Sequence, residues 1–223
     1  DGDASALFKT YRLYRILQDL GIERDTHIIV YSHGNDFFGT YLIWALDYIT
    51  HKNSSLLDGG FERWNKENRE ITQVQTEFER GYYSLPRSLS VNRAIRIYLD
   101  FVKLNMARDD VVILDVRHKD FFDGKNGLTK RPGHIPGAIH HFWVDDLNEA
   151  GSWKSPEVLR ESYKSLGVVP EKVVIVYCNR GRISTHAYFT LKYILNFPNV
   201  FNYDGGFNEW SSIDSLPVET GED

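Results

Sequence analysis

Short runs of apolar residues recur along this chain, and they are predicted to form strands. The residues at 28–31 (IIVY), 111–115 (VVILD) and 174–177 (VIVY) are continuous and rich in β-branched side chains. Continuous apolar runs are typical of strands that are buried on both faces of a parallel sheet. Stretches with helical character follow two of these runs, at residues 40–48 and 184–195. Strands that alternate with helices predict an α/β fold, with a mostly parallel sheet flanked by helices.

Further elements are predicted around the run at 111–115. A helix is expected at about residues 90–106, before that run, and a turn rich in Gly and Pro at 133–138 (GHIPGA), after it. A second helix is expected after Ser155, which is a good N-cap residue. Pro156 then takes the first helical position, where its missing N–H has no cost.

The chain repeats itself at an offset of 146 residues, the distance from Ser32 to Cys178. In both copies a strand run leads to that position, and a turn of similar sequence follows at the same spacing. The turn is DGGFERW at 58–64 in the first copy and DGGFNEW at 204–210 in the second. The Asp of each is expected to be an ordinary turn residue. A matched strand, spacing and turn predict two structural copies of one fold.

We expect an incomplete N-terminal domain at residues 1–75, a linker and first helix at 76–105, and a C-terminal domain at 106–223. The first copy lacks the front half that the second has, because the counterpart of Asp115 would precede residue 1. A sheet without its first strands would expose its edge and core, so we expect that the natural N-terminus has been removed. The only methionine is Met106, so a targeting segment would not be visible here.

Composition and charge exclude several classes of protein. The 223 residues carry 26 Lys and Arg against 31 Asp and Glu, a formal net charge of −5, and the pI is about 5.9. This balance gives no case for nucleic-acid binding or for a polybasic membrane patch. The densest apolar run, at 41–46, is far shorter than the roughly 18 residues that a membrane span needs. We expect a soluble protein without nucleic-acid partners, and the cytoplasm is the favoured compartment.

The single cysteine, Cys178, is the candidate nucleophile. It cannot form an intrachain disulfide, and no second cysteine is present to hold zinc, so neither a metal nor a cofactor is expected. It begins the run CNRGRISTH (178–186), a Gly-containing loop that opens a helix. Such a loop directs backbone N–H groups at one point, and Arg180 and Arg182 add positive charge, which favours a thiolate. An inert cysteine at a strand end is the alternative.

Four motifs together resemble the rhodanese family. They are the loop at 178–186, the strand end DVR at 115–117, the turn at 133–138 and the run YDGGFNEW at 203–210. Over nearly the whole chain, the pair of copies is similar to tandem-domain thiosulfate sulfurtransferases. The resemblance implies two rhodanese-like domains, of which the second is catalytic. The first is expected to be silent, because Ser32 replaces the cysteine and has no adjacent base.

The resemblance also implies a double-displacement reaction. The Cys178 thiolate takes the outer sulfur of thiosulfate, sulfite leaves, and the persulfide passes its sulfur to cyanide or to a thiol acceptor. Arg180 and Arg182 are expected to bind the anion. Backbone N–H groups of the loop are expected to hold the persulfide, and they belong to Asn179, Gly181, Ile183 and Ser184.

Four more residues are open to a catalytic or a structural role. Asp115 and Arg117 would form an ion pair beside the site, or they would brace the strand end against the turn at 133–138. Thr185 would assist the sulfur through its hydroxyl, or it would cap the helix. His186 would line the loop, or it would have no role there.

Departures from the family pattern keep other functions open. The family has Arg where Ile183 stands, and some thiosulfate enzymes have a substrate-binding Arg where Phe121 stands. A 3-mercaptopyruvate sulfurtransferase is therefore the first alternative. A cysteine phosphatase of the same fold needs Arg six places after the cysteine, where this chain has Ser184. A binding module without chemistry would be expected to lose Cys178.

Overall fold

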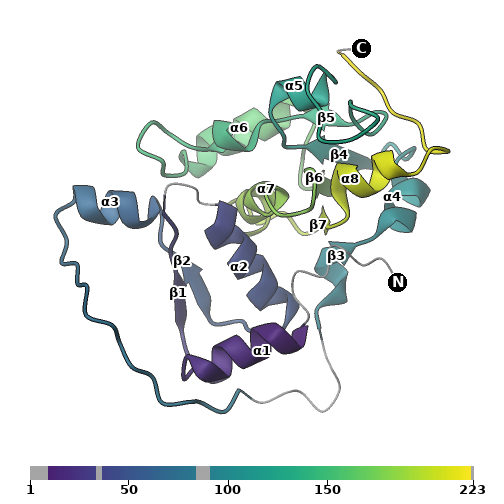
Figure 1. Ribbon diagram of the computed structural model, residues 1–223. Coiled ribbons are helices and arrows are strands. Elements are labelled where there is room, and N and C mark those ends of the chain that lie inside the picture. The colour runs from purple at the N-terminus through teal and green to yellow at the C-terminus, as the bar shows by residue number, and fades with distance from the viewer. Residues whose placement is uncertain (1–9, 34–36, 84–90, 222–223) are drawn as a thin grey trace. The chain divides into compact units, whose positions relative to one another are not determined.

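A computed structural model describes residues 10–33, 37–83 and 91–221 of the chain (Figure 1). The chain divides into two compact units, Asp1–Arg93 and Ala94–Asp223. Among the described residues, no helix has both the length and the apolar character that crossing a membrane requires.

The first unit contains a small parallel sheet with one apolar helix against it. In chain order its elements are α1 (Thr10–Asp19), β1 (Ile28–Val30), α2 (Phe37–Tyr48), β2 (Ser54–Leu56) and α3 (Gly60–Lys66). β1 and β2 pair in parallel. The helix α2 is apolar on nearly every side, as expected of a helix at the centre of a core, and Leu46 has no exposed surface.

The second unit, in the described residues 94–221, is built on a five-stranded parallel sheet. Its strands are β3 (Arg96–Ile97), β4 (Val111–Asp115), β5 (Ile139–His140), β6 (Val173–Tyr177) and β7 (Val200–Tyr203). They lie in the order β3-β7-β6-β4-β5, and each neighbouring pair is parallel. The helices are α4 (Leu99–Asn105), α5 (Lys119–Phe122), α6 (Pro156–Ser165), α7 (Ser184–Phe189) and α8 (Gly206–Ser212). Shorter helical turns are η1 (Arg93–Ile95), η2 (Trp143–Asp146) and the π-type turn η3 (Thr190–Ile194).

The predicted α/β fold is confirmed, and the apolar runs are its central strands. Figure 1 shows helices flanking the strands of the second unit. Ile113 in β4 and Ile175 in β6 pack in one core with Phe207 and Trp210 of α8. A strand that is covered on both faces needs apolar residues at successive positions, which explains the continuous runs. The helix after Ser155 also forms, and the Ser155 hydroxyl accepts the N–H of Val158 at 3.5 Å.

The repeat in the sequence is present in the strand register. Val30 in β1 pairs with Leu56 in β2, and 146 residues later Val176 in β6 pairs with Asn202 in β7. The turns agree as well, because the Phe after each pair of glycines donates its N–H to the residue that follows the first strand. This hydrogen bond joins equivalent atoms in the two units, Phe61 N to Ser32 O at 3.0 Å and Phe207 N to Cys178 O at 2.8 Å.

The units differ in how the sheet is covered. No counterpart of β3, β4 or β5 is found among the described residues of the first unit. The side chains of Ile29 and Tyr31 are accordingly 62% and 58% exposed. Their counterparts in the second unit, Ile175 and Tyr177, have no exposed surface because β4 and the core residues around it cover them.

The helix predicted at 90–106 is wrong over most of its length. Residue 90 lies outside the described residues, and the segment after it forms η1, then the short strand β3, and only then the helix α4. Pairing decides this outcome, because Ile97 lies beside Tyr203 of β7 and is buried in the core. Tertiary pairing at a sheet edge therefore overrides the local helical pattern.

Candidate active site

Cys178 lies directly after β6, at the carboxyl end of the sheet. The strands on either side of β6 are β4, which ends at Asp115, and β7, which ends at Tyr203. The cysteine is a free thiol and its side chain is only 2% exposed. After it the chain bends through residues 179–183 and enters α7 at Ser184. The loop therefore lies at the end of the sheet where parallel α/β folds bind ligands.

The backbone of this loop has N–H groups without partners. Within the described part of the chain, none of the N–H groups of residues 179–184 donates a hydrogen bond. The next two N–H groups along the chain do donate. Thr185 donates its N–H to the carbonyl of Arg182 at 3.1 Å, and His186 donates its N–H to the carbonyl of Ile183 at 3.0 Å. Backbone N–H groups in folded proteins are nearly always paired, so a run of this kind forms a site for an acceptor.

Two glycines allow the loop and the turn after β7 to lie in contact. Gly181 has a φ of +65°, and a side chain there would overlap the backbone of Asp204. Gly206 has a φ of +61°, and a side chain there would overlap the carbonyl oxygen of Cys178. Only glycine adopts such φ values without strain and leaves room for the approach. The Asp-Gly-Gly turn thus fixes the shape of the cysteine loop.

Asp204, directly after β7, forms a buried ion pair, which corrects the expectation that it is an ordinary turn residue. Its carboxylate lies 2.6 Å from a guanidinium nitrogen of Arg96, and both side chains are largely buried. The guanidinium of Arg96 also lies 5.0 Å from the centre of the Tyr98 ring. An ion pair therefore joins the edge strand β3 to the turn after β7, which contacts the cysteine loop.

Asn202 is a buried polar residue of β7 that the sequence analysis missed. Its side chain has no exposed surface. Its Nδ2 donates to the carbonyl of Gly181 at 2.8 Å, and its Oδ1 accepts the hydroxyl proton of Ser184 at 2.7 Å. The same Ser184 oxygen lies 3.5 Å from the sulfur of Cys178. A comparison of the two copies could have found it, because the first copy has the apolar Leu56 at the position where the second has the polar Asn202.

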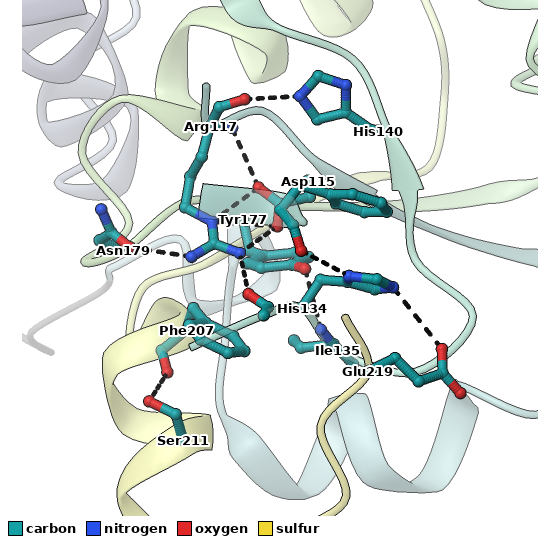
Figure 2. Close-up of polar contacts among 12 residues, drawn as sticks. Asp115, Arg117, His134, Ile135, His140, Tyr177, Asn179, Phe207, Ser211 and Glu219 are labelled. Atoms are coloured by element: carbon teal, nitrogen blue, oxygen red, sulfur yellow. Dashed lines mark hydrogen bonds and ion pairs between the residues drawn. The ribbon is translucent and has the colours of Figure 1, made fainter. Parts of the chain in front are cut away.

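Arg117 is a buried cation that joins the loop to the end of β4 (Figure 2). Its guanidinium makes three hydrogen bonds to the carboxylate of Asp115, at 2.6 to 3.0 Å. It also donates to the carbonyl of Gly133 at 2.7 Å and to the side-chain oxygen of Asn179 at 3.2 Å. The centre of the Phe207 ring lies 4.3 Å from the guanidinium carbon. Arg117 therefore contacts the cysteine loop, the turn at 133–138 and α8 at once.

The charge of Arg117 is maintained by its neighbours. Burial disfavours the cation, but attraction from the Asp115 carboxylate, with smaller contributions from Tyr177 and Cys178, raises the pKa of Arg117 above its usual value. The Asp115–Arg117 pair is thus a neutral buried unit whose cationic end touches the loop through Asn179.

The two arginines of the loop have different surroundings. Arg180 is exposed, and its Nε lies 2.9 Å from the side-chain oxygen of Asn208 in the amide orientation that satisfies both groups. Arg182 is half-buried, and its Nε is buried without a hydrogen-bond partner in the described residues. A buried cationic N–H without a partner is costly, so Arg182 is the better placed of the two to hold an anion.

Thr185 and His186 have partners other than the sulfur of Cys178. The Thr185 hydroxyl donates to the carbonyl of Arg182 at 2.6 Å, which closes the first turn of α7. The ring of His186 is stacked on Trp153, with centroids 4.8 Å apart, and meets Trp143 edge-on at 4.9 Å. Burial lowers the pKa of His186 to about 4, although the carboxylate of Asp146 opposes this shift. His186 is therefore neutral at neutral pH and belongs to the packing of α7 against η2.

Residues 99–213 match the family of rhodanese-like domains. The chain belongs to the rhodanese family. It is 33% identical over 222 residues to the sulfur carrier protein TtuD of Thermus thermophilus, a match that covers 94% of this chain and 76% of that protein. It is 30% identical over 231 residues to a thiosulfate sulfurtransferase of Corynebacterium glutamicum, with 100% of this chain and 73% of that protein covered. This rhodanese chain is therefore a sulfurtransferase.

Solved structures agree on the rhodanese fold. The chain superposes on wild-type EanB with a TM-score of 0.82 and 21% identity, and on a variant of EanB in complex with hercynine with a TM-score of 0.84 and 21% identity. Both matches cover 97% of this chain, but only 55% and 56% of those chains. The chain thus spans about half the length of EanB, and at this identity the similarity concerns the fold alone.

The rhodanese loop brings together only some of the residues singled out from the sequence. Ser184 lies beside the sulfur of Cys178, and Asn179 meets the guanidinium of Arg117. Ile183 is half-buried immediately before α7, where the family pattern has Arg. His186 packs against Trp143 and Trp153 and makes no hydrogen bond to the loop side chains in the described residues. Asn202, which was not singled out, has two hydrogen bonds to the loop.

Proposed function

We propose that this chain transfers the outer sulfur of thiosulfate to cyanide or to a thiol through a persulfide on Cys178. The observation that carries this proposal is the buried thiol followed by a loop whose N–H groups, at residues 179–184, have no partners in the described chain. Such a loop suits a sulfur that is negatively charged both as thiolate and as persulfide, because the donors are already in place. The name of the Corynebacterium glutamicum relative supports thiosulfate as the donor.

The first step is the attack of the Cys178 thiolate on the outer sulfur of thiosulfate. A new S–S bond forms between the two sulfur atoms, and the S–S bond of thiosulfate breaks. Its electron pair leaves with sulfite, and Cys178 becomes a persulfide that carries one negative charge on its outer sulfur. No oxidant, proton or metal is needed to balance this step.

The second step returns the enzyme to its starting state. Cyanide, or the thiolate of an acceptor, attacks the outer sulfur of the persulfide. The S–S bond to Cys178 breaks, its electron pair stays on the Cys178 sulfur, and thiocyanate or an acceptor persulfide leaves. The charge on Cys178 is the same before and after the cycle, so one fixed set of N–H donors serves both steps.

Arg182 and Arg180 are the proposed partners of the sulfonate oxygens. The buried Nε of Arg182, without a partner in the described residues, would gain a charge-assisted hydrogen bond when thiosulfate binds. Arg180 is exposed and would act mainly by attracting the anion. Ile183 carries no charge, so Arg182 and Arg180 are the two loop residues proposed to decide which sulfur donor is preferred.

We propose that the chemistry belongs to the C-terminal domain, residues 106–223, and that the N-terminal domain, residues 1–75, is silent. Ser32 occupies the position of Cys178 in the first unit and follows the equivalent strand, β1. A hydroxyl is a far weaker acid than a thiol, so Ser32 would not supply the ionised nucleophile that the reaction needs. Residues 76–105 would then connect the two domains and supply the first helix of the second.

The test is a side-by-side measurement of sulfite and pyruvate release, with thiosulfate and 3-mercaptopyruvate as donors. Cyanide and dithiothreitol serve as acceptors, and Cys178→Ser is the blank. Sulfite release that is lost in the Cys178→Ser variant is the expected result. Dominant pyruvate release would assign the chain to the 3-mercaptopyruvate enzymes instead, and no turnover with either donor would overturn the proposal.

A further inference from the structure

Asn202 has no role in the reaction as proposed, yet it is buried and has two hydrogen bonds to the cysteine loop. It lies in β7, between β3 and β6, and has no exposed surface. Burial of an amide in a strand costs free energy unless both of its ends are hydrogen-bonded. In the first unit, where Ser32 replaces the cysteine, the position of Asn202 is held by Leu56 in the same register. The amide is therefore present in the unit that has the thiol and absent from the unit that has Ser32, although both units share this part of the fold.

The first contact of Asn202 sets the orientation of a loop peptide. Its Nδ2 donates to the carbonyl of Gly181 at 2.8 Å. This carbonyl and the N–H of Arg182 belong to one planar trans peptide group, so they point in opposite directions. Asn202 thereby fixes the direction of the Arg182 N–H, which is one of the loop donors without a partner in the described residues.

The second contact concerns the hydroxyl nearest the sulfur. Ser184 Oγ lies 2.7 Å from Oδ1 of Asn202 and 3.5 Å from the sulfur of Cys178. A hydroxyl has a single proton to donate. The amide oxygen of Asn202 and a negatively charged sulfur on Cys178 therefore compete for that proton.

We propose that Asn202 is a positioning residue for the charged sulfur of Cys178. While the sulfur is neutral, the Ser184 hydroxyl keeps its hydrogen bond to the amide oxygen of Asn202. When the sulfur is a thiolate or a persulfide, the hydroxyl turns toward it, and the bond from Asn202 to Gly181 keeps the loop in place. Asn202 acts through these two neighbours and does not touch the substrate. The kinetic test of this role rests on the proposed function, because it measures sulfur transfer from thiosulfate. The alkylation test does not, because it measures only the reactivity of Cys178.

The experiment compares two variants of Asn202 with one control. Asn202→Leu installs the residue of the silent copy and removes both contacts. Asn202→Asp keeps an acceptor for Ser184, but it places a second acceptor against the carbonyl of Gly181. Thr190→Val is the matched control, since it removes buried hydrogen bonds to Asp146 and Trp153 elsewhere in the same unit. For each full-length protein, kcat and KM for thiosulfate, the midpoint of thermal unfolding, and the rate of Cys178 alkylation by iodoacetamide at pH 7 are measured.

The expected result is a split between kcat and KM. In both Asn202 variants kcat should fall about tenfold or more, with KM for thiosulfate nearly unchanged, because the Gly181–Arg182 peptide loses its hydrogen bond and no longer directs the Arg182 N–H at the sulfur. Alkylation of Cys178 should slow in parallel. Thr190→Val should lower the unfolding midpoint but leave both rates unchanged. A purely structural role predicts instead that all three variants lose activity in proportion to their loss of stability.

Two outcomes overturn the inference. The first is a folded Asn202→Asp protein with the kcat and the alkylation rate of the wild type, and this variant decides the question if Asn202→Leu does not fold. The second is a fall in kcat in the Asn202 variants that their loss of stability accounts for. If the wild type transfers no sulfur from thiosulfate, the proposed function fails on its own. Alkylation then remains as the readout, and an unchanged rate in the variants would overturn the role of Asn202.

Discussion

Gly206 packs directly against the carbonyl oxygen of Cys178, at a point where any side chain would overlap that oxygen. The next residue, Phe207, donates its N–H to the same oxygen at 2.8 Å. The loop that carries the thiol and the turn after β7 are therefore one structural unit, although they come from segments that are separated along the chain. Substitution in the turn should consequently change the chemistry of the loop.

Gly206→Ala should abolish most of the sulfur transfer and destabilise the fold. A side chain at a φ of +61° costs about 1 to 2 kcal/mol by itself, and the overlap with the Cys178 carbonyl adds to this cost. The measurement is urea unfolding together with sulfite release. Gly137→Ala is the control, because Gly137 has a φ of +72° but no atom lies near the place of a side chain. Equal effects of the two substitutions would show that backbone strain, and not contact with the loop, is responsible.

Asp115→Asn should be among the most destabilising single substitutions in the second unit. It removes the negative charge that compensates Arg117, whose guanidinium is buried and also contacts Asn179. Loss of one partner of a buried ion pair costs about 3 to 5 kcal/mol. Asp110→Asn is the control, since it breaks the exposed ion pair with Arg108 and should hardly change unfolding. A small loss in Asp115→Asn would mean that Arg117 finds another anion or water.

The sequence was sufficient for features that depend on neighbours along the chain. The run at 111–115 predicted β4, and the closeness of Asp115 and Arg117 predicted their ion pair. The spacing of the two copies predicted the common strand register. Each of these depends on local pattern or on a short separation, which periodicity and spacing can report.

The remaining features depend on contacts between distant segments. The helix predicted at 90–106 failed because β3 gains its partner from β7, more than a hundred residues later. Asn202 was missed because its partners, Gly181 and Ser184, lie in another loop. The sequence left open whether His186 lines the loop or has no role there, because packing on the tryptophans of two other segments decides where its ring lies.

Arg182→Ala should weaken thiosulfate binding more than Arg180→Ala does. The Nε of Arg182 is buried without a hydrogen-bond partner in the described residues, whereas Arg180 is exposed and its Nε faces Asn208. A charge-assisted hydrogen bond in a partly buried site contributes about 1.5 to 3 kcal/mol, so KM should rise roughly tenfold to a hundredfold in Arg182→Ala. Steady-state kinetics at several salt concentrations tests this. The salt dependence should weaken in Arg180→Ala, and equal KM values in the two variants would contradict the assignment.

His186 should make the protein less stable in acid. Burial lowers its pKa to about 4, from about 6.5 in the unfolded chain, so the unfolded state binds more protons between these two values. The stability that the neutral ring contributes is complete above about pH 6.5 and is lost as the pH falls toward 4. His186→Phe keeps a ring between Trp143 and Trp153 and removes two buried nitrogens that have no hydrogen-bond partner among the described residues. The unfolding midpoint of this variant should equal or exceed that of the wild type at pH 7, and the difference should widen at pH 5. Parallel pH profiles of the two proteins would show that other groups govern the acid response instead.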